Sequence, residues 1–204
     1  MSVDALSFPA PLPARAGARS LPMTGAADDA GLVSRCLAGE TAAFDILVER
    51  HRRQVYQVCY RFAGNHEDAS DLAQDVFLRA YRALGTFKGQ SAFATWLYRV
   101  AVNVCLNRKA VKRLPTEPLD RREFADSAGD PADRVVIREE RAAAVRAAIS
   151  QLPKKQRATM ILRMYQELPH EEIAAILGSS VGAVKANFFH ALANLKRLLR
   201  EPQR

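Results

Sequence analysis

Hydrophobic residues recur every three or four positions over most of the chain, which is the spacing of helices that have one apolar face. The pattern predicts a short helix within residues 28–37 and longer helices within 44–62, 65–84 and 91–107. It resumes at residue 134 and continues to residue 199. We therefore predict an all-α protein made of two small helical domains that are joined by a flexible linker.

Two segments lack this periodicity. Residues 1–27 are rich in alanine, proline and serine and have no helical periodicity, so we expect a disordered N-terminal extension. Its prolines also interrupt any apolar run that a targeting signal would need. Residues 114–133 combine mixed charges with Pro115, Pro118 and Pro131, which predicts a linker. The two domains are therefore expected at residues 28–113 and 134–204.

The helix predicted within 65–84 carries two distinct stripes. Asn65 is a good N-cap, and Leu72 and Val76 belong to an apolar stripe that faces a core. A second stripe is charged, with acids near the start of the helix and bases near its end, and it is a solvated face or a docking surface for a charged partner. The charged positions are Asp68, Asp71, Asp75, Arg79 and Arg82.

The next helix differs in charge, since no acid occurs between Asp75 and Glu117. Ser91 is a candidate cap, and an apolar stripe that includes Trp96 is expected to pack inward, which favours a core role for this indole. The connecting segment GTFKGQSAF surrounds aromatic and polar residues with glycines. This composition suits a site that stacks unpaired bases and binds their edges, although a short loop between helices with core aromatics explains it equally well.

The C-terminal domain contains the pattern of a helix-turn-helix within residues 169–199. Gly178 supplies the tight turn and Ser180 caps a long second helix. On that helix, Phe189 falls on the side opposite the apolar stripe. An outward phenylalanine either contacts a thymine methyl group in the major groove or packs against a neighbouring helix.

Composition narrows the class of partner. The net charge of +8 and the isoelectric point near 9.8 favour a polyanion, and no apolar run approaches the roughly 20 residues that insert into a membrane. The three cysteines and four histidines lack metal-binding spacing, so we expect no metal site, and reduced thiols in a cytoplasmic protein. Nucleotide-binding and hydrolase motifs are also lacking, so we expect no enzyme activity and no cofactor.

Two longer runs carry a family resemblance. DLAQDVFLRAYRAL followed by FKGQSAFATWLYRVAVNVCLN resembles region 2 of the extracytoplasmic-function (ECF) sigma factors, in the sigma-70 family. LPHEEIAAILGSSVGAVK resembles region 4 of the same family. The likeness then departs from the family, because Ala186, Asn187 and His190 stand where relatives commonly carry Ser-Arg and a later arginine. We therefore expect an altered minus-35 preference.

The resemblance implies a sigma factor that binds the bacterial RNA polymerase core and directs it to promoter DNA, under control of an anti-sigma factor. The implied polymerase contacts are Asp68, Asp71, Leu72, Gln74, Asp75 and Phe77, of which Leu72 and Phe77 are expected to lie partly or wholly in the core. The implied minus-10 contacts are Phe87, Lys88, Ser91, Trp96, Arg99 and Asn103. The implied minus-35 contacts are Ser180, Lys185, Ala186, Asn187, Phe189, His190 and Arg197. The alternative is a free-standing helix-turn-helix regulator that acts without polymerase.

Overall fold

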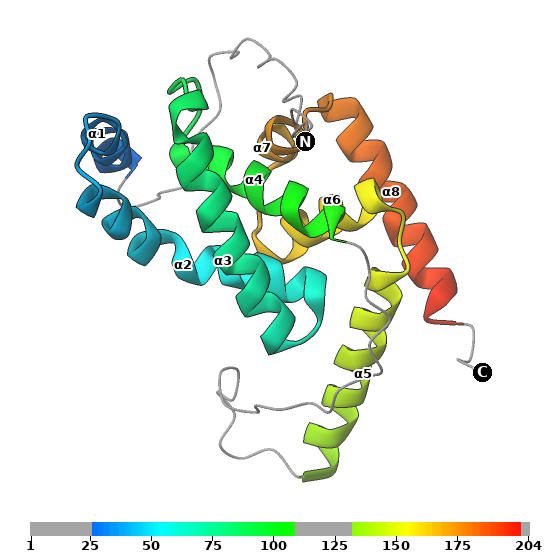
Figure 1. Ribbon diagram of the computed structural model, residues 1–204. Helices are drawn as coiled ribbons and strands as arrows, with labels where there is room; N and C mark the ends of the chain where they lie inside the picture. Colours follow the sequence, from blue (N-terminus) through cyan, green and yellow to red (C-terminus); the bar gives the residue numbers. More distant parts are fainter. Residues whose placement is uncertain (1–25, 109–131, 201–204) are drawn as a thin grey trace, which may run out of the picture.

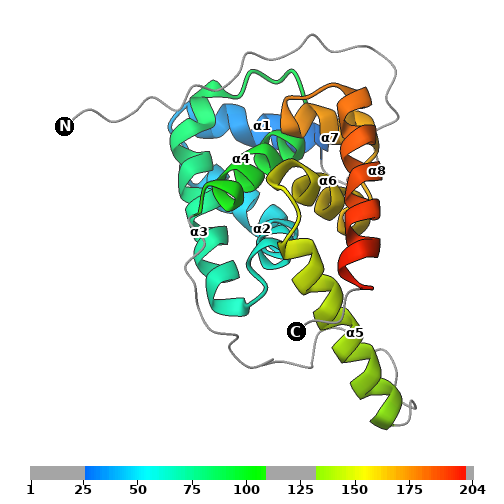
Figure 2. The same cartoon turned by 90° about the vertical axis from the view of Figure 1, so that its right-hand side faces the viewer.

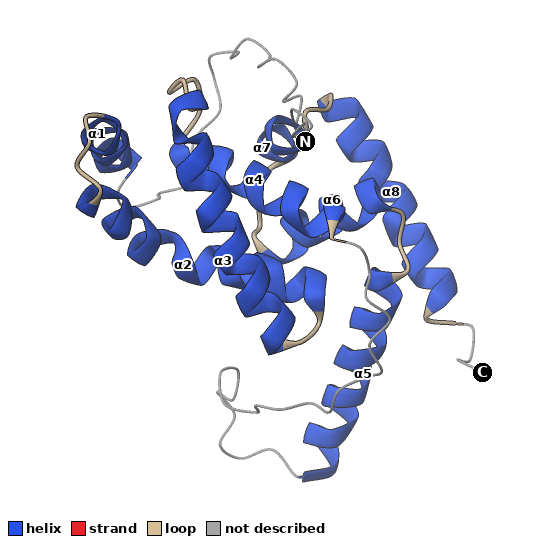
Figure 3. Ribbon diagram, in the orientation of Figure 1, coloured by secondary structure: helices blue, strands red, loops and turns tan. Residues whose placement is uncertain are grey.

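The computed structural model describes residues 26–108 and 132–200, and within these ranges every regular element is helical (Figures 1 and 3). The first group of helices is α1 (Ala26–Leu37), α2 (Ala42–Ala63), α3 (His66–Ala83), the short 3-10 helix η1 (Leu84–Thr86) and α4 (Phe93–Asn107). The second group is α5 (Ala132–Ser150), α6 (Lys154–Tyr165), α7 (His170–Leu177) and α8 (Val181–Leu198). The predicted all-α fold is confirmed. Most of the predicted extension and linker lies outside the described residues.

Three of the predicted helix boundaries are confirmed by local chemistry. The Asn65 side chain accepts a hydrogen bond from the Asp68 amide at 2.8 Å, and the Ser180 hydroxyl accepts one from the Ala183 amide at 3.2 Å. Each side chain satisfies an amide in the first turn of its helix that has no intrahelical partner. Gly178 ends α7 with φ 58°, in the left-handed region that glycine adopts without strain.

The prediction that Ser91 caps α4 is wrong. The helix begins at Phe93 with Ala92 as its N-cap, and no side chain caps its first amides. The Ser91 hydroxyl instead donates a long hydrogen bond of 3.4 Å to the Ala92 carbonyl. The start of α4 coincides with the burial of the Phe93 ring, so packing and not capping accounts for the boundary.

The first domain is built on the α2–α3 hairpin, with α4 crossing it and α1 covering one end (Figure 1). Its core follows the predicted helical stripes. The fully buried residues of α2, α3 and α4 include Leu47, Val55, Val58, Val76, Leu97 and Val102. Burying side chains of this size is worth roughly 1.5 to 3 kcal/mol each, which is the main contribution to the stability of the bundle.

A polar network inside this core joins α1 to α2. His51 is buried, and its Nε2 lies 2.9 Å from the Asp29 carboxylate. Arg50 donates to Asp29 at 2.6 Å and to Asp28 at 2.6 Å. The two acids differ in environment, because the Asp29 side chain is 5% exposed and that of Asp28 is 67% exposed.

The second domain packs α6, α7 and α8 around a smaller core that includes Ile161, Leu162, Ile173 and Val184. This core is continuous with that of the first domain, since α7 packs on α4 and α6 packs on α2. Figure 2 shows α4 lying between α3 on one side and α6 and α7 on the other. The two predicted domains are therefore in direct contact.

We expect Asp29→Ala to lower the free energy of unfolding by about 2 to 3 kcal/mol, because it leaves His51 buried without its partner. The matched variant Asp28→Ala also removes an ion pair with Arg50, but at an exposed site, so it should cost less than about 1 kcal/mol. Chemical denaturation followed by circular dichroism measures both values. Equal losses in the two variants would contradict a structural role for burial at Asp29.

Candidate polymerase and nucleic-acid interfaces

The polar face of α3 offers a set of exposed groups between partly buried apolar residues. Asp71 and Gln74 are exposed, and Asp75 is half-buried and accepts a hydrogen bond from Arg79 at 2.8 Å. Leu72 is buried and Phe77 half-buried, which confirms that both belong wholly or partly to the core. Among the predicted polymerase contacts, Asp71 and Gln74 are thus the most accessible to a partner.

Asp68 stands apart from this set because it is bound within the chain. Arg108, at the end of α4, donates to its carboxylate at 2.6 Å and to its backbone carbonyl at 3.0 Å, and Asn65 donates to the same carboxylate at 2.9 Å. The Asp68 side chain is only 17% exposed. Its carboxylate ties the start of α3 to the end of α4, a role that no local sequence pattern signals.

The segment between α3 and α4 is held by a cluster of three aromatic rings. The Phe87 ring lies edge-on to that of Phe93 at 5.7 Å between centroids, and the Trp96 ring lies 5.7 Å from Phe87 and 5.6 Å from Phe93. Phe87 and Trp96 are half-buried, whereas Lys88 and Ser91 are exposed. The segment therefore combines core aromatics with an exposed polar rim, and the half-buried rings keep part of their surface open.

Two predicted minus-10 residues on α4 have different environments. Asn103 is exposed, whereas the Arg99 guanidinium donates to the backbone carbonyl of Ala175 on α7. The neighbouring Tyr98 hydroxyl donates to Gln166 Oε1 at 3.0 Å. Burial, with a smaller effect of Glu172, raises the pKa of Tyr98 to about 12, so this hydroxyl remains a donor at neutral pH. Arg99 thus lies at the contact between the two domains.

The face of α8 that was predicted to point outward is open. Lys185, Ala186, His190 and Arg197 are exposed, and Asn187 is half-buried. Phe189 is 70% exposed, and its ring lies 5.9 Å from the ring of His190 in the same helix. Of the two alternatives for Phe189, this exposure argues against packing on a neighbouring helix. The opposite face, with Val184 and Ala191, is buried.

Metal-binding clusters of histidine, cysteine, aspartate and glutamate do not occur among residues 26–108 and 132–200. Within the same ranges, no helix combines the length and the apolar character that crossing a membrane requires. The cysteines of these ranges are free thiols.

Comparison with known proteins identifies both halves of the chain. Residues 47–113 match the family model of sigma-70 region 2, and residues 142–195 match that of sigma-70 region 4. The RNA polymerase sigma-H factor of Pseudomonas aeruginosa is 35% identical over 181 residues, which covers 84% of this chain and 94% of that protein. The ECF RNA polymerase sigma factor SigM of Mycobacterium tuberculosis is 37% identical over 172 residues, which is 84% of each chain.

Two solved structures resemble this fold. CnrH, solved in complex with the cytosolic domain of CnrY, is 27% identical with a TM-score of 0.64, over 86% of this chain and 99% of that one. RpoE of Bartonella quintana, solved with the anti-sigma factor NepR, has a TM-score of 0.56 at 18% identity and supports the fold alone. Because the relatives match along most of their length and both regions occur in order, the chain belongs to the ECF group of the sigma-70 family of RNA polymerase sigma factors.

Proposed function

We propose that this sigma factor divides promoter recognition between its two helical domains, with residues 28–113 acting as region 2 and residues 134–204 as region 4. The observation that carries the proposal is the open face of α8, which leaves Lys185, Phe189 and His190 exposed while the opposite side is buried. A helix with this division can enter the major groove without unfolding its own core. In this reading, region 4 binds the minus-35 element.

Within the minus-35 contact, the charged groups bind phosphates and the uncharged groups contact bases. Lys185 and Arg197 bind phosphates and orient the helix, and such contacts carry no sequence information. Asn187 and His190 present hydrogen-bonding groups to base edges, and Phe189 presents an apolar ring to a thymine methyl group. Ala186 contributes little beyond close approach, and Ser180 fixes the start of the helix. The preferred sequence therefore depends on a few uncharged side chains.

Region 2 binds the polymerase and captures the melted minus-10 strand. The exposed Asp71 and Gln74, with Asp75 beside them, dock on the clamp helices of the largest subunit, as the family resemblance implies. Phe87 stacks on an unpaired base with its open surface, while Lys88, Ser91 and Asn103 bind the strand around it. Trp96 supports the Phe87 ring, and Arg99 joins the strand contact when it leaves Ala175. This surface is supported from within by the core residues Leu72 and Phe77 and by the contact of Asp68 with Arg108.

Several wider properties follow from this assignment. The chain has no catalytic activity of its own, since bond formation belongs to the polymerase, and it acts in the cytoplasm, where the polymerase is. Relatives of known structure were solved with CnrY and with the anti-sigma factor NepR. We infer that an anti-sigma factor of the same kind restrains this protein. A free-standing regulator has no use for a region 2, so that alternative is disfavoured.

Run-off transcription with purified core polymerase tests the function directly. A pool of promoter fragments is transcribed with and without the protein, and new transcripts should start downstream of one shared pair of sequence elements. In parallel, the protein alone is tested for binding to the same duplexes. Tight binding to duplex DNA without polymerase, together with no new transcript and no binding to core, would establish the free-standing regulator instead.

Phe87→Ala should lower the yield of open complexes by about tenfold, because each stacked base contributes roughly 1 to 3 kcal/mol. Permanganate reactivity of unpaired thymines measures opening, and binding of holoenzyme to closed duplex is measured beside it and should change little. Phe87→Leu is the matched control, since it keeps an apolar side chain against Phe93 and Trp96 but removes the flat ring. Equal losses of opening and duplex binding would contradict base stacking by Phe87.

Phe189→Ala should reduce the affinity of the holoenzyme for minus-35 promoters about fivefold without changing the melting temperature, because the ring touches only DNA and His190. Phe188→Ala is the matched control on the same helix. Its ring packs edge-on to His170 at 5.9 Å, so this variant should lower the free energy of unfolding by about 2 kcal/mol. A loss of stability in Phe189→Ala as large as that in Phe188→Ala would contradict groove contact.

A further inference from the structure

Helix α1 lies outside the part of the chain that matches the region 2 family model, which begins at residue 47. Two buried side chains, Leu32 and Val33, seat this helix in the core of the first domain. Besides α2, it contacts η1 and α4. These two elements flank the segment assigned to strand capture, so α1 is placed to affect the geometry of that segment.

A polar contact leads from α1 into α2. The Asp29 carboxylate is 5% exposed, accepts a hydrogen bond from Arg50 at 2.6 Å and lies 2.9 Å from Nε2 of His51. The His51 side chain is itself 4% exposed. Breaking either bond would leave a buried polar group without a partner, which is costly. Asp29 therefore holds the imidazole ring of His51 in one orientation.

The same imidazole ring contacts the aromatic cluster. Its centroid lies 5.4 Å from that of the Phe93 ring, with the two planes inclined at 55°. The Phe87 ring lies edge-on to the same Phe93 ring, at 5.7 Å between centroids and 89° between planes. Aromatic pairs at this separation prefer edge-on or offset arrangements, so a rotation of Phe93 changes the favoured position of Phe87. Phe93 thus transmits the orientation of His51 to the ring assigned to base stacking.

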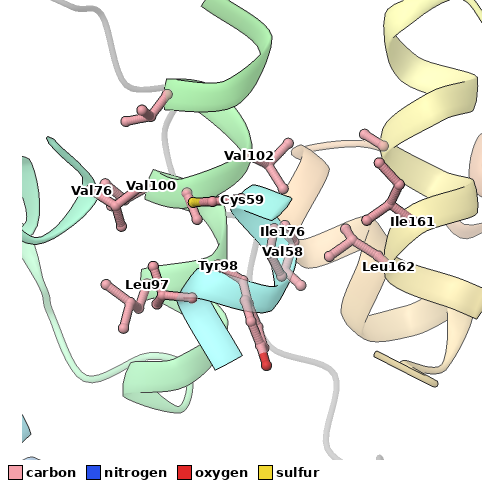
Figure 4. Close-up of a cluster of buried hydrophobic side chains, with 14 of the residues drawn as sticks. Val58, Cys59, Val76, Leu97, Tyr98, Val100, Val102, Ile161, Leu162 and Ile176 are labelled. Carbon is pink, nitrogen blue, oxygen red and sulfur yellow. The ribbon is translucent and has the colours of Figure 1, made fainter. Parts of the chain in front are cut away.

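Few other features of the chain fix the orientation of Phe93. The residue is the first of α4, and no side chain caps the helix there. The body of α4 is anchored further along by buried residues such as Leu97 and Val100 (Figure 4). The start of the helix depends instead on the rings that pack against Phe93, and that of His51 comes from the helix that Asp29 joins to α1.

We propose that His51 is a positioning residue for the opening of promoter DNA. Held by Asp29 of α1, its ring supports Phe93 and thereby keeps the Phe87 ring oriented to stack on an unpaired base. The inference rests on the assignment of Phe87 to base stacking made above. His51 is buried and acts only through these rings, so it should affect the opening step and leave binding to closed duplex intact.

His51→Gln in the holoenzyme tests the proposal, because a glutamine amide can still bond to Asp29 but presents no ring to Phe93. The yield of open complexes, measured by permanganate reactivity, should fall about fivefold, which is part of the contribution of one stacked base. Binding to core polymerase and to closed duplex should change little. Val104→Ala is the matched control, since Val104 is also buried but lies about 16 Å from Phe93 along α4. This control should destabilise the domain without lowering the yield of open complexes.

A double variant separates positioning from a general loosening of the domain. Effects of independent residues add, whereas residues that act through a common group are not additive. The variant that combines His51→Gln with Phe87→Ala should therefore open promoters as well as Phe87→Ala alone. If His51→Gln lowers opening by the same factor in both backgrounds, His51 acts independently of Phe87 and the proposal is overturned.

Asp29→Asn provides a second variant should His51→Gln fail to fold. It keeps the shape of the side chain but weakens the hold on His51 by removing the charge, so it should lower opening with the same dependence on Phe87. Unaltered opening in a folded variant of either residue would overturn the proposal. Phe87→Ala then separates the two failures. A loss of opening in Phe87→Ala would leave the proposed base stacking intact, whereas no loss there would remove both the stacking and the role of His51.

Discussion

Backbone carbonyls at the ends of helices decide how the two halves of this sigma factor associate. At the starts of α3 and α8, a local side chain accepts from one free amide of the first turn, within the same domain. The carbonyls of Phe62 and Ala175 have no such local solution and receive guanidinium groups from across the interface. The Phe62 carbonyl is partly buried, and a buried carbonyl without a partner costs roughly 1 to 3 kcal/mol, so the end of α2 is better satisfied when the second domain is present.

The helices that bear the proposed contact residues also contribute residues to the core, and the helical period places the two sets of side chains on different faces. On α8 the separation is clean, with Val184 and Ala191 buried and Phe189 open. On α3 the separation is less complete, because Asp68 in the charged stripe accepts a hydrogen bond from Arg108 while Asp71 in the same stripe is exposed. The polar face of a helix is therefore not a uniform binding surface, and its individual residues have to be assigned one at a time.

Periodicity predicted nearly all of the helices and both faces of α8, because burial along a helix is set by neighbours three and four residues away. It did not predict that Arg99 would bond to Ala175, which is 76 residues further along the chain and offers only a backbone carbonyl. Nor did it predict that Asp68 would bind Arg108, which is also distant in the sequence. The prediction for Ser91 was wrong because the N-cap of α4 is Ala92, one residue after Ser91. Packing of Phe93 sets the start of the helix.

The aromatic cluster between α3 and α4 has a consequence for spectroscopy. Trp96 is the one tryptophan among the 204 residues, and its indole lies against Phe87 and Phe93 in the segment assigned to strand capture. Intrinsic fluorescence excited at the red edge of protein absorption therefore has a single source in this molecule. Every change in its emission reports on the surroundings of that segment, without any label attached to the chain.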